Sequence, residues 1–332
     1  MKILVIDLIT QKGHIKFVRN YLSLLNYLGE VRFISSKDYI SKIGYNNCYV
    51  ISNWFFNYNN KYEYVIKQVL LIILLSFKIN KNFKNYKIIV TGFENISFFI
   101  AWRFISNKTY VVIHNNLTRG ILSIYSFKRI KSNITFIALE NYIKEFIESK
   151  YKKKTYFIPH PIDIINIKEN RNLSDNIIFC PSGSSNFEEI DKFKNTLNNN
   201  SKLILIAKSN TEIINKNIIF KKYFDDYDTI FDKSKFIFIP FKYDYRVSGV
   251  FYESMNYNKI ILTTKNSGLF IHQMKKLYPN SIFFIESFED IEEINISNEL
   301  KEKEYKKFIS LHNNLQIFTE FKKMFLEQND KI

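Results

Sequence analysis

The segment between Arg246 and Glu253 combines side-chain types that bind phosphate and sugar groups. Ser248 supplies a hydroxyl, and Gly249 follows it at the expected start of a helix. Backbone N–H groups at a helix N-terminus attract an anion such as a phosphate. Glu253 lies about one turn into this helix, where its carboxylate could accept hydrogen bonds from a ribose diol. The pattern predicts a site for a phosphorylated ligand that carries a sugar.

The elements on either side of this segment predict how it is positioned. An apolar run over residues 236–239 ends at Pro240 and indicates a buried strand, and a second strand is expected over residues 260–262. Strand, loop, helix and strand form a βαβ unit, in which ligands bind outside the carboxyl ends of the strands. An ordinary βαβ turn, in which Gly249 serves only the backbone geometry, is the alternative interpretation.

This segment resembles the nucleotide-sugar-dependent glycosyltransferases with two Rossmann domains, the GT-B type, and in particular the large retaining group called family 4. That family has a Glu, then seven residues, then a second Glu, followed by a helix end with small residues and a strand. Glu253 matches the second Glu, whereas Tyr245 stands where the first Glu, which contacts the donor sugar, is expected. The run from Arg246 to Gly249 is similar to a variant in which a Ser-Gly pair faces the diphosphate.

The resemblance also implies donor-binding residues elsewhere in the second half. A small-residue loop follows the strand expected over residues 176–180, and such a loop could approach a phosphate. The family usually brings an Arg and a Lys to the diphosphate from this loop and its helix, and this loop has neither, so the nearest basic candidates are Lys208 and Arg246. The predicted donor-binding residues are therefore Ser182, Gly183, Lys208, Arg246, Ser248, Gly249 and Glu253.

Two positions in the first half are similar to the family's other cleft residues. Gly13 and His14 follow the first strand, as does the family's Gly-Gly-His-like loop that faces the interdomain cleft. His114 comes directly after the strand over residues 110–113, where a histidine of the family faces the donor sugar or the acceptor. We assign Gly13 and His14 to the acceptor side or cleft, and His114 with Glu253 as catalytic residues. An exposed loop histidine at 14 and a polar strand end at 114 are the alternatives.

Length and a proline-rich segment predict two domains. A chain of 332 residues exceeds the usual single-domain size. Pro159-His160-Pro161 continues neither strand nor helix, and it resembles the family's interdomain segment. We expect an α/β protein of two Rossmann-like domains facing across a cleft. These are a basic acceptor-binding domain over residues 1–160, a nucleotide-sugar-binding domain over residues 161–312, and a final helix over residues 313–332 that packs back on the first domain.

The positive charge belongs to one half of the chain. The net charge is +16, and residues 1–160 hold 24 Lys and Arg against 8 Asp and Glu, whereas residues 161–332 hold 24 of each kind. A genome-wide bias towards lysine would affect both halves alike. The asymmetry therefore predicts an anionic partner for the first half: a membrane surface, a nucleic acid or a phosphorylated acceptor. We favour the membrane, because no nucleic-acid-binding motif accompanies the charge.

Cysteine and aspartate patterns bear on metals and disulfides. Cys48 and Cys180 lie in different halves without metal-ligand spacing, which argues against a zinc site or a disulfide scaffold and fits a reducing cytoplasm. The run Asp225-Asp226-Tyr227-Asp228 contains an Asp-x-Asp pattern that holds a metal in another glycosyltransferase fold. We interpret it as acidic residues at a helix start, which satisfy free N–H groups, and expect no metal.

No stretch of the sequence predicts a membrane span. The N-terminal run MKILVIDLI contains Asp7 and indicates a first strand instead of a signal peptide. The most apolar segment, residues 69–75, is too short to cross a bilayer. A buried helix is the favoured interpretation, and an interfacial helix is the alternative, supported by the lysines that follow at positions 78, 81, 84 and 87.

Together, the sequence and the resemblance predict a metal-independent hexosyl- or related glycosyltransferase. It would move a sugar from a nucleotide-diphosphate sugar to a glycan or polyprenyl-linked acceptor, in surface polysaccharide or glycoconjugate synthesis. No cofactor and no nucleic-acid partner are expected, and the predicted location is cytoplasmic, peripheral at the inner face of the cell membrane. The alternative is a catalytically silent GT-B partner or scaffold in a membrane-associated synthesis complex, which the missing first Glu and the missing Arg/Lys pair favour.

Overall fold

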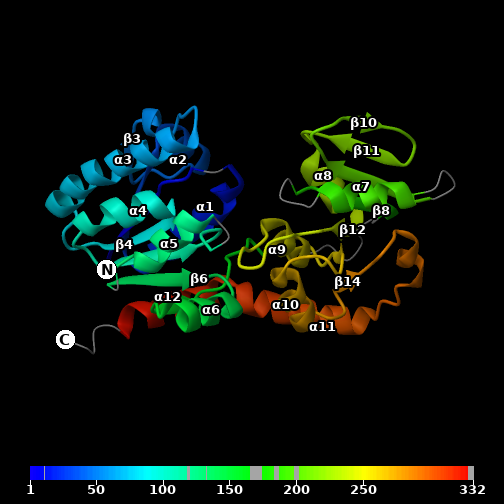
Figure 1. Ribbon diagram of the computed structural model, residues 1–332. Helices are drawn as coiled ribbons and strands as arrows, with labels where there is room; N and C mark the ends of the chain where they lie inside the picture. The colour runs from blue at the N-terminus through cyan, green and yellow to red at the C-terminus, as the bar shows by residue number, and fades with distance from the viewer. Residues whose placement is uncertain are drawn as a thin grey trace. The chain divides into compact units, whose positions relative to one another are not determined.

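The chain divides into two compact units, residues 1–163 with residues 312–332, and residues 164–311. The structure is a computed structural model that describes residues 1–10, 12–117, 120–131, 133–164, 174–182, 187–197 and 202–327. A seven-stranded sheet forms the centre of each unit (Figure 1). Gly183, one of the predicted donor-binding residues, lies outside the described residues.

The sheet of the first unit is parallel, with strand order β3-β2-β1-β4-β5-β6-β7. Most of its strands are buried along their length, as near-continuous apolar runs in a parallel sheet should be. The strands are β1 Lys2–Asp7, β2 Glu30–Ser36, β3 Cys48–Ile51, β4 Lys87–Gly92, β5 Thr109–Ile113, β6 Ile134–Ala138 and β7 Thr155–Phe157.

Helices pack on the sheet of the first unit (Figure 1). Local sequence sets their ends: Ser36 caps α2 by accepting a hydrogen bond from the Tyr39 N–H, and Gly44 ends it with a left-handed φ of 72°. The helices are α1 Ile15–Asn26, α2 Lys37–Ile43, α3 Lys61–Asn82, α4 Asn95–Ala101, α5 Ile121–Arg129, α6 Asn141–Tyr151 and α12 Asn314–Leu326, with short 3-10 helices η1 Lys12–His14, η2 Asn53–Phe55 and η3 Trp102–Phe104.

The sheet of the second unit repeats this design, with strand order β10-β11-β9-β8-β12-β13-β14. Its pairs are parallel except β10 with β11. The strands are β8 Ser174–Cys180, β9 Ile204–Lys208, β10 Ile213–Ile214, β11 Ile218–Lys221, β12 Ser234–Phe238, β13 Ile260–Thr263 and β14 Ile282–Phe284. The helices are α7 Phe187–Thr196, α8 Tyr227–Lys233, α9 Gly249–Asn256, α10 Leu269–Leu277 and α11 Asn298–His312, with the 3-10 helix η4 Glu289–Glu293.

Aromatic side chains fill the core beneath the second sheet. The rings of Phe193, Phe238 and Phe288 lie with centroids 4.9 to 5.4 Å apart, in tilted and edge-on arrangements. All three side chains are buried. Because these residues come from α7, β12 and the segment after β14, the cluster holds α7 against the part of the sheet that contains β12.

The C-terminal segment forms two helices, α11 and α12. Asn313 separates α11 from α12 and caps α12, since its Oδ1 accepts a 2.8 Å hydrogen bond from the Gln316 N–H. Helix α12 belongs to the first unit, where Phe321 packs against Tyr21 with ring centroids 5.2 Å apart. Phe325 packs in the same way against Tyr110, at 5.1 Å.

The prediction of a buried helix over residues 69–75 is wrong for one side of the helix, which is exposed. The segment forms the middle of α3, and only one side of that helix is buried. Leu71, Ile72 and Leu75 are enclosed, whereas Leu70 and Leu74 are 45% and 57% exposed. Sequence periodicity could not separate the two faces, because apolar residues surround the whole helix here. None of the described helices is both long and apolar enough to cross a bilayer.

Candidate functional site

The loop after β12 lies where the strand order of the second sheet reverses. Strand β8 begins this sheet, and β9 and β12 pair on its two sides. Open α/β sheets bind ligands at such a switch point, outside the carboxyl ends of the strands. Ser182 follows β8, Lys208 ends β9, and residues 239–248 follow β12. The topology therefore brings these predicted donor-binding segments to one edge of the sheet.

Ser248 sets the start of α9. It is the N-cap residue in an extended conformation, and its Oγ accepts a 3.3 Å hydrogen bond from the Phe251 N–H. The hydroxyl keeps its proton, which a phosphate oxygen could accept. Ser248 is therefore both the cap of the helix and a candidate ligand contact.

Gly249 is not required by the backbone or by packing. Its φ lies outside the left-handed region, and a Cβ added there would meet nothing within 4 Å. Gly268 shows the opposite case, because its added Cβ would lie 2.5 Å from the Tyr243 carbonyl oxygen. The alternative interpretation of Gly249, a glycine needed for turn geometry, therefore fails. The glycine leaves open space over the first turn of α9, where a ligand could approach the backbone.

Glu253 is held by a residue that the sequence did not single out for this role. Tyr227, the first residue of α8, donates a 2.7 Å hydrogen bond from Oη to Glu253 Oε2. Burial, followed by the neighbouring negative charge of Glu253, raises the pKa of the Tyr227 phenol far above its ordinary value, so the phenol stays a donor. A carboxylate accepts several hydrogen bonds, so this one orients Glu253 without using its full capacity.

The basic candidates lie against aromatic rings. The Arg246 guanidinium carbon is 4.9 Å from the centroid of Tyr243, and Lys208 Nζ is 5.4 Å from that of Tyr223. Tyr245, at the position of the family's first Glu, is half-buried, and burial raises the pKa of its phenol. A neutral phenol thus stands where a carboxylate was expected.

In the first unit, His14 and His114 come together although 100 positions separate them in the chain. Their ring centroids are 4.5 Å apart, and the Phe17 ring meets His114 edge-on at 4.6 Å. His14 follows β1, next to the switch point between β1 and β4, and His114 follows β5. A Cβ added to Gly13 would meet nothing within 4 Å. His14 is thus packed against a second histidine instead of standing alone in a loop.

Asp7 holds the loop that carries Gly13 and His14. Its Oδ1 accepts hydrogen bonds from the Ile9 and Thr10 N–H groups at 3.0 and 2.8 Å, and its Oδ2 accepts one from Thr91 Oγ1 at 2.9 Å. The carboxylate is fully buried. The sequence offered one signal, an acidic residue at the end of an apolar strand, which we used only as evidence against a signal peptide.

A second buried network holds the segment that follows β5. Asn95 Nδ2 donates to the Asn116 carbonyl at 2.8 Å and to Ser123 Oγ at 2.9 Å, and Asn116 Nδ2 donates to Asn95 Oδ1 at 2.8 Å. Asn116 Oδ1 also accepts from the His114 N–H at 3.4 Å. The network ties the β5 end to α4 and α5, and so places His114.

Two further histidines, His160 and His312, lie next to each other in the first unit. The His160 ring centroid is 5.0 Å from that of Phe17, and His160 Nδ1 is 2.8 Å from the Pro161 carbonyl oxygen. His312 Nδ1 lies 2.8 Å from the His160 carbonyl oxygen, and since a carbonyl only accepts, each Nδ1 carries the proton. Burial lowers the pKa of His160 to about 3 and that of His312 to about 4. The sequence indicated His160 only as part of a linker, and gave no signal for His312.

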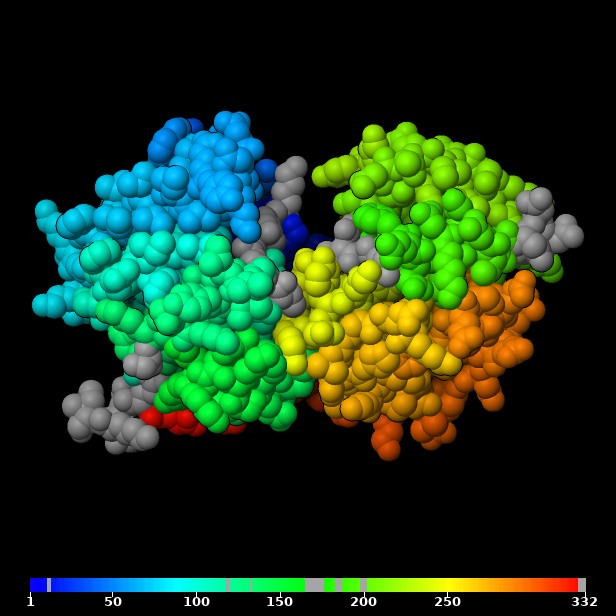
Figure 2. Space-filling view, viewed as in Figure 1, coloured from blue at the N-terminus to red at the C-terminus, as the bar shows by residue number. Residues whose placement is uncertain are grey.

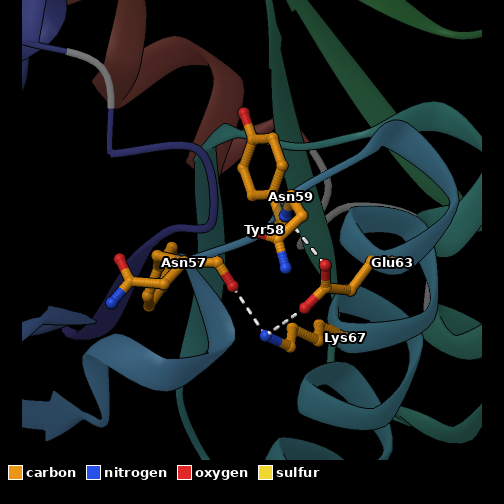
Figure 3. Close-up of a pocket in the computed structure, with 6 residues that line it drawn as sticks. Asn57, Tyr58, Asn59, Glu63 and Lys67 are labelled. Carbon is orange, nitrogen blue, oxygen red and sulfur yellow. Dashed lines mark hydrogen bonds and ion pairs between the residues drawn. The ribbon is translucent and has the colours of Figure 1, made fainter.

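A hollow of about 650 Å³ lies beside η2 at the carboxyl end of β3. Figure 3 shows Lys67 reaching across it, where Nζ donates to the Asn57 carbonyl at 2.6 Å and pairs with Glu63 at 2.7 Å. Glu63 Oε2 also accepts a 2.8 Å hydrogen bond from the Asn59 N–H. The two charged side chains of the hollow, Lys67 and Glu63, therefore bind each other. The half-exposed ring of Tyr58 also lines the hollow.

Across the described ranges, no group of three or more His, Cys, Asp or Glu side chains is placed to hold a metal ion. The predicted capping role of the Asp225–Asp228 run holds only in part. Asp226 is the N-cap of α8, but its side chain makes no capping hydrogen bond.

Comparison with solved structures decides the fold. The sequence itself matches no protein-family profile and no curated protein. The structure is similar to a glycosyltransferase from Rickettsia africae ESF-5, with a TM-score of 0.68 at 13% identity over 100% of both chains. It is also similar to HepE from Anabaena, solved with UDP and glucose, with a TM-score of 0.68 at 11% identity over 98% of this chain and 100% of HepE. The chain has the GT-B fold.

A third GT-B structure covers less of the molecule. TarM from S. aureus, solved with UDP and α-GlcNAc-glycerol among its ligands, gives a TM-score of 0.59 at 14% identity over 78% of this chain and 59% of TarM. At these identities the likeness establishes the fold, as the order of elements and the Ser-Gly segment predicted. Membership of family 4 stays a prediction, and Tyr245 remains its clearest departure.

Proposed function

We propose that this GT-B chain is a glycosyltransferase that moves a hexose or related sugar from a nucleotide-diphosphate sugar. The observation that carries the proposal is the start of α9, where Gly249 leaves open space and Glu253 is fixed by Tyr227. The HepE and TarM structures with UDP support the choice of a nucleoside diphosphate as leaving group. The acceptor we propose is a glycan or a polyprenyl-linked glycan in surface polysaccharide or glycoconjugate synthesis.

The proposed roles follow from the chemistry of each group. The N-terminus of α9 and the cations Arg246 and Lys208 would stabilise the charge that develops on the diphosphate. Glu253 would accept hydrogen bonds from hydroxyl groups of the ribose or the sugar. His14, at the carboxyl edge of the first sheet, would serve the acceptor side, and His114, packed beside it, would act as a catalytic residue. Because fixed dipoles and cations supply this stabilisation, we expect sugar transfer to survive chelation of divalent metals.

Titration calorimetry of the full chain with UDP, GDP, ADP and the corresponding sugar conjugates tests the proposal. Glu253→Gln removes the charge and keeps the shape, and we expect its affinity for the bound nucleotide sugar to fall by about ten-fold or more. Glu286→Gln is the matched control, because Glu286 belongs to the same unit and is exposed. A folded protein that binds none of these ligands would overturn the proposal.

A catalytically silent GT-B partner is the second candidate, and the phenol of Tyr245 in place of a carboxylate favours it. Release of UDP from a UDP-sugar, measured with membrane extracts that contain polyprenyl-linked glycans, separates the two. Turnover that His114→Ala abolishes supports the enzyme. Nucleotide binding without turnover under every acceptor tried would assign the chain to the silent class.

We place the protein in the cytoplasm, peripheral to the membrane. The support is the charge excess of the first half and two cysteines that are both free thiols. Fractionation of cells that express the full chain tests this location. Recovery in the soluble fraction at both low and high salt would contradict it.

A further inference from the structure

The outer face of α3 exposes large apolar side chains along four turns. The members are three to four residues apart and so share one side of the helix: Tyr62, Ile66, Leu70, Leu74 and Phe77, with exposed fractions of 83, 60, 45, 57 and 72%. Figure 2 shows this part of the chain, in light blue and cyan, at the surface of the first unit. A contiguous exposed apolar surface of this kind marks an interaction site in a folded protein.

The inner face of α3 shows that this arrangement is not an ordinary amphipathic helix. Lys67, Gln68 and Ser76 are buried against the unit, and Lys67 pairs with Glu63. Residues 64–77 contain no other charged residue, so the outer face has no charge along this length. A surface helix in water carries its polar residues outwards. Here polar residues point inwards, so the outer face fits a medium other than water.

Neighbouring helices extend the apolar surface. Helix α4 packs against α3 on one side and α5 on the other, so the three helices form one layer (Figure 1). At the start of α5, Ile121 is 87% and Leu122 is 73% exposed, and Phe104 after α4 is 53% exposed. We call the outer side of this layer, with the five α3 residues, Phe104, Ile121 and Leu122, the α3–α5 face.

The charge of this region is strongly positive. Residues 61–131 hold 12 Lys and Arg against Glu63 and Glu94. Neither acid offsets the excess at the surface, because Glu63 is bound to Lys67, and Glu94 is buried and accepts from the Ile96 and Ser97 N–H groups. The exposed bases on these helices or beside their ends are Lys61, Lys81, Lys84, Arg103, Lys128, Arg129 and Lys131.

We propose that the α3–α5 face binds the surface of an anionic lipid bilayer, with α3 lying in the plane of the interface. The apolar side chains would enter the boundary between headgroups and acyl chains, and the surrounding bases would bind lipid phosphates. A second copy of the chain suits the face less well, because two such faces would bring two strongly basic regions together. The inference is independent of the sugar-transfer chemistry; it rests on the proposed peripheral location and names the surface that makes the contact.

Vesicle flotation of the full chain tests the inference. Vesicles of phosphatidylcholine mixed with phosphatidylglycerol should retain the protein, and vesicles of phosphatidylcholine alone should retain it far less. The double variant Leu70→Gln, Leu74→Gln should lower partitioning on the order of ten-fold or more, because two apolar side chains no longer leave water. The matched control is Ile214→Gln, Leu315→Gln, since these side chains are 73% and 75% exposed on other elements.

Tryptophan fluorescence gives a second readout beside α3. The chain has two tryptophans, and Trp102 is buried whereas Trp54 is 54% exposed and lies 4.5 Å from Lys67 Nζ. Binding should shift the emission of Trp54 to the blue, and lipids with brominated acyl chains should quench it. Trp54→Phe should remove both effects and leave flotation in place.

The possible results distinguish membrane binding from dimer formation and from loss of the nucleotide site. Flotation that the Leu70→Gln, Leu74→Gln variant leaves unchanged, or no flotation with anionic lipid, would overturn it. Light scattering that shows a dimer in the wild type and a monomer in this variant would assign the face to a second copy, which also overturns it. UDP binding measured on the same variant distinguishes loss of the membrane contact from loss of the proposed transferase site, because only the latter resides on α9.

Discussion

Tyr227 Oη donates a 2.7 Å hydrogen bond to Glu253 Oε2 and so joins the start of α8 to the middle of α9. The donor and the acceptor are 26 residues apart, and β12 lies between them in the chain. The bond fixes the carboxylate at the edge of the sheet where β8 and β12 meet. Any ligand that depends on the orientation of Glu253 therefore depends on Tyr227 as well.

Replacement of Tyr227 by Phe tests this dependence. The ring keeps its packing against Phe179 and Phe231, and only the hydroxyl is lost. We expect affinity for the nucleotide sugar to fall about ten- to hundred-fold, because a hydrogen bond to a charged group contributes on the order of 1.5–3 kcal/mol. Calorimetry measures this effect, and the double variant with Glu253→Gln should be no weaker than Glu253→Gln alone. Full additivity of the two losses would show that Tyr227 does not act through Glu253.

Two glycines near this site should respond to alanine in opposite ways. Gly249→Ala adds a methyl group to open space in a helix, so we expect the free energy of unfolding to stay unchanged or rise by up to about 1 kcal/mol. Nucleotide affinity should fall, because the methyl group stands over the first turn of α9. Gly268→Ala should lower the free energy of unfolding by at least about 1–3 kcal/mol, since its Cβ meets the Tyr243 carbonyl.

Denaturant unfolding and calorimetry on the two glycine variants decide this prediction. A stable Gly249→Ala protein with wild-type nucleotide affinity would show that the open space over α9 is not a ligand site. A Gly249→Ala protein that loses stability would show that the glycine has a structural role.

Asp7 should support the first-unit histidines without contacting a ligand itself. Asp7→Asn keeps the shape and weakens the acceptance of hydrogen bonds from Ile9, Thr10 and Thr91. We expect the free energy of unfolding to fall by about 2 kcal/mol, because a neutral amide accepts these hydrogen bonds less strongly than a carboxylate and its NH2 group faces Thr91 or the loop N–H groups. The loop that carries His14 should then shift, so kcat should fall while nucleotide affinity in the second unit stays unchanged. Equal loss of kcat and nucleotide affinity would point to general unfolding instead.

Local patterns in the sequence were enough to predict the parallel strands at the centre of both sheets, because these strands are apolar runs bounded by turns. The Ser248–Gly249 helix start was predictable for the same reason, since its signal lies within a few consecutive residues. Contacts between distant residues left no such signal: His14 meets His114, and Tyr227 meets Glu253, only after the strands pair. For α3 the sequence left a buried and an interfacial helix as alternatives, because the run over residues 69–75 is apolar on every side and has no periodicity to show which side is buried.

The buried pair His160 and His312 should make the first unit sensitive to acid. Burial lowers the pKa of His160 to about 3 and that of His312 to about 4, whereas a histidine in the unfolded chain has a pKa near 6.5. Below about pH 6.5 the unfolded state binds protons that the folded state does not. The free energy of unfolding is therefore highest above that pH, and it decreases as the pH falls towards the folded-state pKa values of about 4 and 3. Each histidine contributes a slope of up to about 1.4 kcal/mol per pH unit, or about 2.7 for both.

Tryptophan fluorescence is a suitable probe for this titration, because Trp54 and Trp102 both belong to the first unit. Denaturant unfolding between pH 6.5 and 5 should show the slope in the wild type. The double variant His160→Asn, His312→Asn should flatten it, since the amide keeps a donor near the position of Nδ1 and does not titrate. His272→Asn, in the second unit, should leave the slope intact. If the wild-type free energy of unfolding stays constant over this range, the two histidines have the same pKa in the folded and the unfolded state, and the prediction is wrong.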